Sequence, residues 1–293
     1  METIDNVKQS TTYTNNNQIV FSDLLRDEVI SNPFVNSKVN FEGENNLLLI
    51  DSNVQVSNSI INFKGSNSLI YIRKTRNNKL SISCSIYNES TLFINQGSSV
   101  NGRLNLVISE SQNILIGRDC MFSFGCWLRT ADVHLIYDSN TKNRINFSKG
   151  LIIGDHVWIG QDSKLLKGAK IGSRSVVGLG TVVSNAVPSN SIVAGVPAKI
   201  VKLDIFWDRQ SSHFFTSDEG RKHDSYQKKS SSFEFGKDSN EQVWLAFSEQ
   251  LSAIKKVTNK VEAIDEFDKN TRPLVIEALV KKNRLFSRFK KNN

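Results

Sequence analysis

Aliphatic residues recur at every sixth position in the middle of the chain. The series is Ile153, Ile159, Leu165, Ile171, Val177 and Val183. Such a period fits neither an α-helix, which repeats every ~3.6 residues, nor one long strand, which alternates every ~2. It predicts short strands wound into a solenoid, in which each side of a coil points one aliphatic residue inward.

Four segments with a wider spacing precede this series. They are NNLLLI at 45–50, NSLIYI at 67–72, ESTLFI at 89–94 and SQNILI at 111–116. Their last isoleucines are 22 residues apart each time. Each segment predicts one longer coil of the same solenoid. Because a single coil cannot bury its apolar side alone, the coils are expected to stack over residues 41–202.

Polar stretches divide the chain around this repeat. Residues 1–40 are expected to form a polar lead with one short helix, capped by Ser22. Residues 137–149 are out of register, which predicts a loop that projects from the solenoid. Residues 203–240 are polar and charged and are expected to form a linker, and residues 241–293 a helical extension.

The hydrophobic period becomes helical towards the end of the chain. An apolar stripe from Val243 to Ile264 predicts one amphipathic helix, with Ser239 and Gln242 in capping-box spacing before it. A second helix is expected to start near Thr271. Two amphipathic helices need a partner face, which can be each other, the solenoid or another subunit.

Composition and charge narrow the picture further. The 293 residues carry a formal net charge of +8, which suits an anionic ligand or partner without identifying one. The three cysteines, Cys84, Cys120 and Cys126, are odd in number and lack paired spacing. This argues against a disulfide framework and favours small buried side chains that fill the coil corners.

The sequence also bears on location. The start of the chain lacks the layout of a signal peptide, and no apolar run approaches the length of a membrane span. We therefore expect a soluble, cytoplasmic protein. A basic stretch follows near the end, formed by Lys281, Lys282, Arg284, Arg288, Lys290 and Lys291. We favour a solvated helix end there over a contact with a membrane or a glycan-assembly partner.

Two polar residues interrupt the repeat just before the projecting loop. Asp132 stands where other coils have a small residue, and His134 where the next aliphatic residue is due. A solenoid has no structural need for this break, and sites are often built at loops. A histidine beside a carboxylate can act as a general base, because the acid orients the ring and stabilises its charged form. A hydrogen-bonded structural histidine at the base of the loop is the alternative.

Four motifs resemble those of a known family. They are RTADVH (129–134), INFSKGLIIGDHVWIG (145–160), KGAKIGSRSVVGLGTVV (167–183) and AGVPAKIVK (194–202). Together they resemble the hexapeptide-repeat acyltransferases, and in layout especially the sugar O-acetyltransferases that act on galactosides, maltose and sialic-acid polysaccharides. The resemblance implies a mainly β fold, a left-handed parallel β-helix, here followed by a C-terminal helical extension.

The resemblance also implies a catalytic set. The histidine matching His134 removes the proton of an acceptor hydroxyl, which attacks the thioester of acetyl-CoA. The tryptophan matching Trp158 lies beside that thioester. Asp132 is the candidate partner of His134, although some relatives have asparagine or glutamate in this role. Leu135 departs from the proline that many relatives have after the histidine.

A groove for coenzyme A completes the expected site. The candidate binding residues are Trp158, Gly160, Gln161, Gly178, Leu179, Gly180, Ser184, Lys199 and Lys202. The three glycines allow a ligand to approach the backbone closely, and each also suits a coil corner. By resemblance, the main chain at Gln161 and Leu179 bonds the pantetheine arm, with Ser184 nearby. The two lysines match positions that meet the nucleotide phosphate, where lysine serves as a mobile point charge.

The leading expectation is an acetyl-CoA-dependent O-acetyltransferase acting on a bacterial surface carbohydrate, such as a capsule, a lipopolysaccharide or a glycoprotein glycan. N-acetylation of an amino sugar and a non-catalytic scaffold with a basic helical tail stay open. A metal site of the carbonic-anhydrase type needs three converging histidines, which the four in this chain do not suggest. No nucleic-acid partner is expected, since basic and aromatic residues are not interleaved. By resemblance, the protein is a homotrimer with the groove between neighbours.

Overall fold

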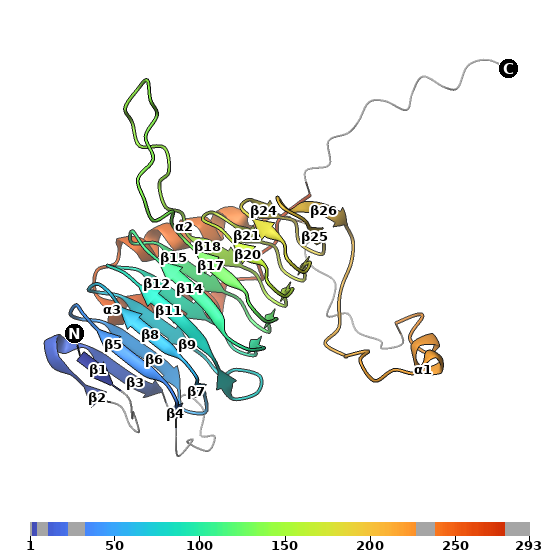
Figure 1. Ribbon diagram of the computed structural model, residues 1–293, viewed down its shortest axis with the longest axis horizontal. Helices are drawn as coiled ribbons and strands as arrows, with labels where there is room; N and C mark the ends of the chain where they lie inside the picture. Colours follow the sequence, from blue (N-terminus) through green and yellow to red (C-terminus); the bar gives the residue numbers. More distant parts are fainter. Residues whose placement is uncertain (1, 5–10, 23–32, 227–237, 279–293) are drawn as a thin grey trace.

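The computed structural model describes residues 2–4, 11–22, 33–226 and 238–278, and shows a three-sided parallel β-solenoid (Figure 1). Sheet A contains, in spatial order, β1 (Glu2–Ile4), β5 (Lys38–Phe41), β8 (Ile60–Phe63), β11 (Ile82–Ile86), β14 (Leu104–Ile108), β17 (Trp127–Arg129), β20 (Lys164–Leu165) and β23 (Val182–Val183). Sheet B contains β2 (Thr11–Thr12), β3 (Gln18–Ser22), β6 (Leu47–Asp51), β9 (Leu69–Ile72), β12 (Thr91–Ile94), β15 (Asn113–Ile116), β18 (Leu151–Ile153), β21 (Lys170–Ile171) and β24 (Ala186–Val187).

The third side is shared by two sheets. Sheet C contains β10 (Lys79–Leu80), β7 (Gln55–Ser57) and β4 (Phe34–Val35). Sheet D contains β13 (Ser99–Val100), β16 (Met121–Phe122), β19 (Trp158–Ile159), β22 (Val176–Val177), β25 (Ile192–Ala194) and β26 (Lys199–Lys202). The expected parallel β-helix with a C-terminal helical extension is therefore confirmed.

Long coils are followed by short coils along the solenoid axis, as the sequence predicted. In the long coils, Ile72 lies opposite Ile50 on one side and Ile94 on the other, each 22 residues away. In the short coils, Ile153 lies opposite Ile171, 18 residues away. All of these side chains are buried in one continuous core. Stacking of equivalent aliphatic residues thus closes the inside of every coil.

The stack starts earlier than residue 41. Strand β3 pairs in parallel with β6, and β1 pairs antiparallel with β5. Ile19 of β3 is completely buried in the same core as the later coils. The polar lead therefore contributes strands, because Gln18–Ser22 offers backbone groups and the apolar side chains of Ile19 and Phe21 to the first coil. The expected helix after Ser22 lies outside the described residues.

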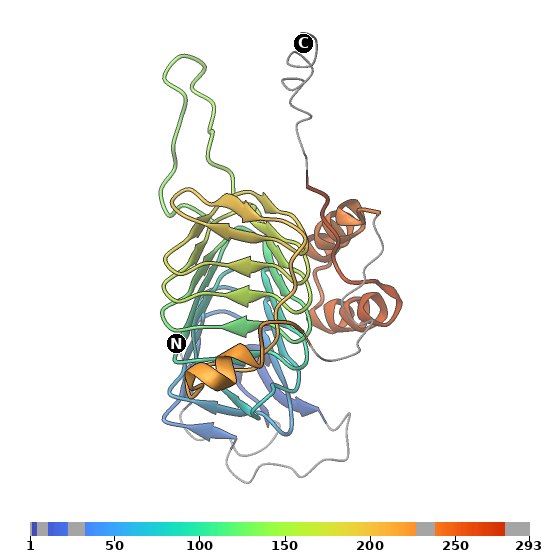
Figure 2. The same ribbon diagram turned by 90° about the vertical axis from the view of Figure 1, so that its right-hand side faces the viewer.

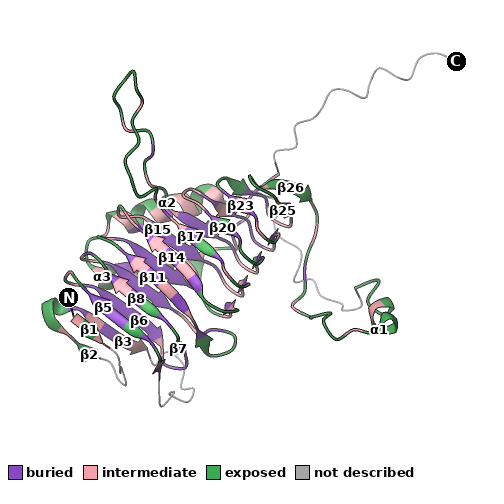
Figure 3. Ribbon diagram, viewed as in Figure 1, coloured by how far each residue is buried: buried purple, intermediate pink, exposed green. Residues whose placement is uncertain are grey.

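A long loop leaves the solenoid between β17 and β18 (Figure 1). Its two arms run antiparallel: Asp138 N donates to Asn143 O, and Ile145 N donates to Ile136 O, each at 2.9 Å. The loop carries exposed apolar side chains. Figure 3 shows the loop mostly exposed, whereas the solenoid strands are mostly buried or intermediate. The expected projecting loop at 137–149 is thus the outer part of this hairpin.

The helical extension differs from the expected arrangement. The stripe from Val243 to Ile264 belongs to two helices, α2 (Glu241–Ala253) and α3 (Val257–Asn270), which lie against one side of the solenoid (Figure 2). The helix break falls at the extended residues Ile254 and Lys256. The expected capping box does not form, because the Ser239 hydroxyl donates to Val275 O instead.

The second helix expected near Thr271 is also absent from the described residues. Residues 271–278 form neither helix nor strand. The amides of Ser173 and Ser189 donate to Leu274 O and Ile276 O, each at 2.9 Å, so this stretch ties the helices to two coil corners. The basic stretch after residue 278 lies outside the described part of the chain.

Helices α2 and α3 cover the outer face of sheet B. Its outward column, Leu49, Tyr71, Phe93 and Leu115, packs against Phe247, Leu251 and Ile264 in a second apolar core. Arg73 adds ion pairs to Asp265, at 2.6 Å, and to Asp268 of α3. The solenoid itself is thus the partner face that the amphipathic helices require.

The remaining expectations on composition agree with the structure. The three cysteines are free and buried, and burial raises the pKa of the Cys84 thiol to about 12 and of Cys126 to about 11. They act as small apolar side chains rather than nucleophiles. Within the described residues, no helix has the length and apolar content needed to cross a bilayer.

Candidate functional site

His134 lies at the base of the projecting loop, where the chain leaves sheet A on its way to sheet B; we call this corner the A/B edge. Its side chain is exposed, and among the described residues its ring makes no hydrogen bond. Its backbone is held firmly: Asn146 Nδ2 donates to His134 O at 2.7 Å. An accessible imidazole on a fixed backbone is available for proton transfer with a bound ligand.

Asn146 joins the two arms of the loop base. It is 5% exposed, and its Oδ1 accepts from the amide of Ile136 at 2.9 Å. Its Nδ2 also lies 3.3 Å from Asp132 Oδ2. The sequence analysis missed this residue, although it stands inside the INFSKG motif. A buried side chain that bonds both arms fixes where His134 can point.

Asp132 has two partners at the loop base. Its Oδ2 forms an ion pair with Lys167 of the next coil and accepts from Asn146. The bond from Lys167 lowers the pKa of the Asp132 carboxyl, with a smaller contribution from Asn146. Among the described residues no bond joins this carboxylate to the His134 ring, so Asp132 as the partner of the histidine stays a prediction.

A second set of expected residues lies at the corner between sheets D and A, which we call the D/A edge. Gly160 is packed so tightly that an added Cβ would lie 2.7 Å from the Leu179 nitrogen. Gly180 has φ +66°, and an added Cβ would meet nothing within 4 Å, so its backbone faces open space. The Gly180 amide donates to Gln161 O at 2.7 Å. The glycines therefore bring the corners close together and leave the outer backbone bare.

This bare edge fits an extended ligand with amide groups. Leu179 is 72% exposed, and Gln161 is exposed as well. Among the described residues, the backbone N–H groups of Gln161 and Leu179 have no backbone acceptor. These two N–H groups, on successive coils, could thus receive the carbonyl oxygens of a pantetheine arm.

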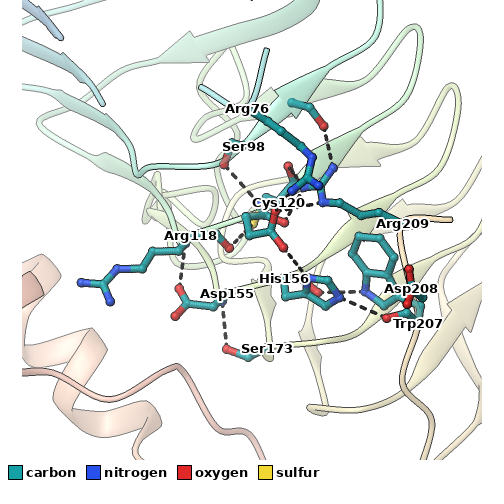
Figure 4. Close-up of polar contacts among 12 residues, drawn as sticks. Arg76, Ser98, Arg118, Cys120, Asp155, His156, Ser173, Trp207, Asp208 and Arg209 are labelled. Carbon is teal, nitrogen blue, oxygen red and sulfur yellow. Dashed lines mark hydrogen bonds and ion pairs between the residues drawn. The ribbon is translucent and has the colours of Figure 1, made fainter. Parts of the chain in front are cut away.

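Trp158 projects from β19 on the outer face of sheet D and is 39% exposed. Its indole lies 5.9 Å, centroid to centroid, from that of Trp207, which belongs to the segment expected to be a linker. Figure 4 shows the Trp207 indole beside the ring of His156. Sequence analysis missed this packing, because Trp207 stands alone in a polar stretch.

The last expected residues lie apart from one another. Lys199 and Lys202 are exposed on β26, the final strand of sheet D. Ser184 lies at the A/B edge, where it lines a hollow together with Lys167. Within one chain it is therefore separated by sheet A from Gln161 and Leu179, which it was expected to accompany.

The expected site is thus divided between two places in a single chain. His134, Asp132 and Ser184 lie at the A/B edge. The glycines, Gln161 and Leu179 lie at the D/A edge, with Trp158 and the two lysines on sheet D. Sheet A separates the two groups, so one chain alone does not bring the imidazole to the bare backbone.

The chain is similar in sequence to two polysialic acid O-acetyltransferases. The one from Neisseria meningitidis is 36% identical over 172 residues, which cover 58% of this chain and 79% of that protein. The one from Escherichia coli O1:K1 / APEC is 34% identical over 151 residues, 52% of this chain. That match spans about half (49%) of the E. coli protein's length. No family model matches the chain.

A solved structure agrees with these sequence matches. The crystal structure of a polysialic acid-specific acetyltransferase superposes with a TM-score of 0.57 and 33% sequence identity, covering 65% of this chain and 89% of that one. A solenoid of this kind, with these motifs at its edges, defines an acyltransferase of the hexapeptide-repeat class. The chain belongs to the hexapeptide-repeat O-acetyltransferase family.

Proposed function

We propose that the protein transfers an acetyl group from acetyl-CoA to a hydroxyl of a bacterial surface carbohydrate. The observation that carries this proposal is the exposed imidazole of His134 on a loop base fixed by Asn146. Family membership supports the reaction class, and the names of the two relatives support an acidic glycan such as polysialic acid as the acceptor.

In this mechanism His134 is the general base. Its ring nitrogen takes the proton of the acceptor hydroxyl as the oxygen attacks the thioester carbonyl carbon. The C–S bond then breaks, and the proton passes from the imidazolium to the departing thiolate, which gives free CoA and an acetyl ester. Trp158 would flank the thioester, while Lys199 and Lys202 would meet the phosphates of the donor.

The acyl donor would lie along the D/A edge. The backbone amides of Gln161 and Leu179 would bond the pantetheine carbonyls, and the open backbone at Gly180 leaves room for the arm. Gly178, whose added Cβ would lie 3.2 Å from the Ala194 side chain, lets the next corner pack closely beneath it. Binding of this kind uses main-chain donors and needs few side chains.

The separation of the two edges favours a site shared between copies. A head-to-tail ring places the A/B edge of one copy beside the D/A edge of the next, because such an interface joins two different surfaces. The loop base adds exposed apolar residues for this contact, with Val133 71% and Phe147 59% exposed. A closed homotrimer, as the resemblance implies, would contain three such sites.

An acceptor screen tests the reaction. The protein is incubated with acetyl-CoA and purified capsular, lipopolysaccharide and sialic-acid glycans, and free thiol release is followed together with the mass of the glycan. Ester formation on at least one glycan is expected. If thiol release with every glycan stays at the rate without acceptor, and no acetylated sugar is found, the proposed function is wrong.

Mixed assemblies test whether the site is shared. His134→Ala and Trp158→Ala subunits are each expected to be nearly inactive, whereas co-expression restores activity. With random mixing, about one interface in four pairs an intact His134 of one copy with an intact Trp158 of its neighbour. Size-exclusion chromatography confirms that mixed oligomers form. If mixed oligomers form and remain inactive, the His134 and the Trp158 of one site come from the same chain.

A further inference from the structure

The segment after β26, residues 203–209, is here called the strap. It runs along the corner between sheets B and D and bonds to turns of several coils. Near its start, Ile205 N donates to Asn190 O at 2.9 Å, and Asn190 Nδ2 donates to Ile205 O at 3.0 Å. At its end, Arg209 Nη1 donates to Ser99 Oγ at 2.9 Å. Since each coil of a solenoid contacts only the coils next to it, the strap joins coils that do not contact each other directly.

The centre of the strap forms a reciprocal pair with His156. Trp207 Nε1 donates to His156 O at 2.9 Å, and His156 Nε2 lies 3.1 Å from Trp207 O. The two rings stack with centroids 4.0 Å apart and planes inclined by 12°. Trp207 is only 7% exposed, and its indole also contacts that of Trp158. The strap therefore supports the Trp158 side chain.

The protons available to His156 constrain this pair. Nδ1 lies 2.7 Å from Asp119 Oδ2, and Nε2 faces the carbonyl oxygen of Trp207. Both partners are acceptors, and a neutral imidazole carries only one N–H. Both bonds can form together only when the ring is an imidazolium. Its stacking on the indole is then a cation–π contact as well.

Asp119 is the carboxylate that contacts the cationic side chains around this ring. Asp119 also accepts from Arg209 Nε at 2.9 Å and lies 3.4 Å from Arg76 Nη1, while Asp208 follows Trp207 on the strap. Partial burial alone would raise the pKa of Asp119, but the bonds from His156 and Arg209 hold it below its ordinary value. Asp119 therefore stays ionised and available to the histidine (Figure 4 shows Arg209 and His156 converging).

We propose that the strap is part of the acyl-donor side of the site: Trp207 is a positioning residue that holds the Trp158 indole, and the imidazolium of His156 holds Trp207. This inference rests on the proposed function, in which Trp158 lies beside the thioester. Removal of the His156 ring takes away its bond to Trp207 O and its stacking on the indole. Docking of the strap is then expected to weaken by about 10- to 100-fold, as for the loss of one hydrogen bond to a charged group.

Donor binding tests the positioning role without any acceptor. Binding of acetyl-CoA to the full chain is measured by calorimetry for the wild type, Trp207→Ala, Trp207→Phe and Phe214→Ala. Trp207→Ala is expected to weaken binding about three- to tenfold, the range of an aromatic pair, and Trp207→Phe much less. Phe214 is 95% exposed in the same part of the chain, so its variant is the matched control and should bind like the wild type.

Hydrogen exchange tests the role of His156. Exchange of residues 205–209, measured at one pH, is expected to be slow in the wild type. In His156→Asn it should be about 10- to 100-fold faster, because the bond to Trp207 O and the ring stacking are lost. Asparagine suits this position because His156 has φ +54°, which asparagine tolerates. Circular dichroism confirms that each variant is folded at the temperature used.

The outcomes separate the inference from the proposed function. Unchanged acetyl-CoA binding in a folded Trp207→Ala variant overturns the positioning role and leaves the proposed function intact. Equal exchange of residues 205–209 in the wild type and in folded His156→Asn overturns the role of His156 in holding the strap. If the wild type binds no acetyl-CoA at all, the proposed function and the positioning role both fail. The exchange data then still test whether His156 holds Trp207 in place.

Discussion

The long and short coils of this solenoid have the same inner core and different outer surfaces. On sheet B of the long coils, β9 and β12 are buried at every position, because α2 and α3 cover their outer face. On sheet B of the short coils, β21 leaves Lys170 half-buried, and only a small apolar cluster of Leu274 and Ile276 covers Ile152 of β18. The covered coils gain a second apolar core, while the short coils keep bare edges at which a ligand can reach the backbone. Stability and candidate chemistry are therefore concentrated in different coils.

The largest expected effect tests the short coils alone. His134→Ala should lower turnover about 10²–10⁴-fold, because the general base is lost. The unfolding temperature should stay within about 2 °C of the wild type, since an exposed ring without hydrogen bonds contributes little to stability. Thiol release and thermal unfolding followed by circular dichroism measure the two quantities. His213→Ala, also an exposed histidine, serves as control, and turnover within threefold of wild type for His134→Ala would rule out the general base.

The reverse result is expected in the long coils. Phe93→Ala should lower the free energy of unfolding by about 3–4 kcal/mol, because it removes a buried ring from the interface between sheet B and α3. Turnover at a temperature where the variant is folded should stay close to wild type. Urea unfolding measures the first quantity, with the exposed Phe214 changed to alanine as the control. A loss of turnover in fully folded Phe93→Ala would contradict the division between the two kinds of coil.

A smaller effect on turnover is expected at the loop base, where a buried side chain holds the backbone of the candidate base. Asn146→Ala removes the bond to His134 O and the bond to the Ile136 amide. Turnover should fall about tenfold, because the imidazole is less well positioned. The KM for acetyl-CoA should change little if the donor lies at the other edge. Steady-state kinetics separate the two constants. Asn146→Asp keeps the acceptor for Ile136 but places a carboxylate oxygen against His134 O and Asp132, so it should lose at least as much turnover as alanine. Equal effects on kcat and KM would point to a general loosening of the loop base.

The inner core of the solenoid could be predicted from the sequence because its spacing repeats. Ile153, Leu165 and Val177 all point inward, since stacked coils leave each equivalent position only one environment. The sequence also contains a pattern for the outer core on sheet B, but the sequence analysis did not interpret it. Leu49, Tyr71, Phe93 and Leu115 are also 22 residues apart, and each continuous apolar run predicts a parallel strand buried on both faces.

The candidate site was harder to predict for a physical reason. Short motifs identify which residues are unusual, and they did so for His134 and Trp158, but the side of the coil on which each stands depends on where the loop leaves the stack. The partner of Asp132 is a lysine one coil away, and the neighbour of Trp158 comes from a segment without a repeat. Contacts of this kind depend on three-dimensional register, which the spacing of one chain does not reveal.

The smallest expected effect is a pH dependence that belongs to the covered coils. Lys260 of α3 is fully buried and donates to Glu89 O, and burial lowers its pKa to about 8. The unfolded chain binds more protons than the folded one between about pH 8 and pH 10.5, so this group makes stability rise with pH in that window and fall as pH drops through 8. Between pH 7 and pH 9 wild type should gain about 1 kcal/mol relative to Lys260→Met, as measured by urea unfolding at each pH. Lys256→Met, at the exposed residue just before the same helix, should show no such difference. A parallel pH dependence in wild type and Lys260→Met would mean that Lys260 keeps an ordinary proton affinity, and that its helix docks without burying a charge.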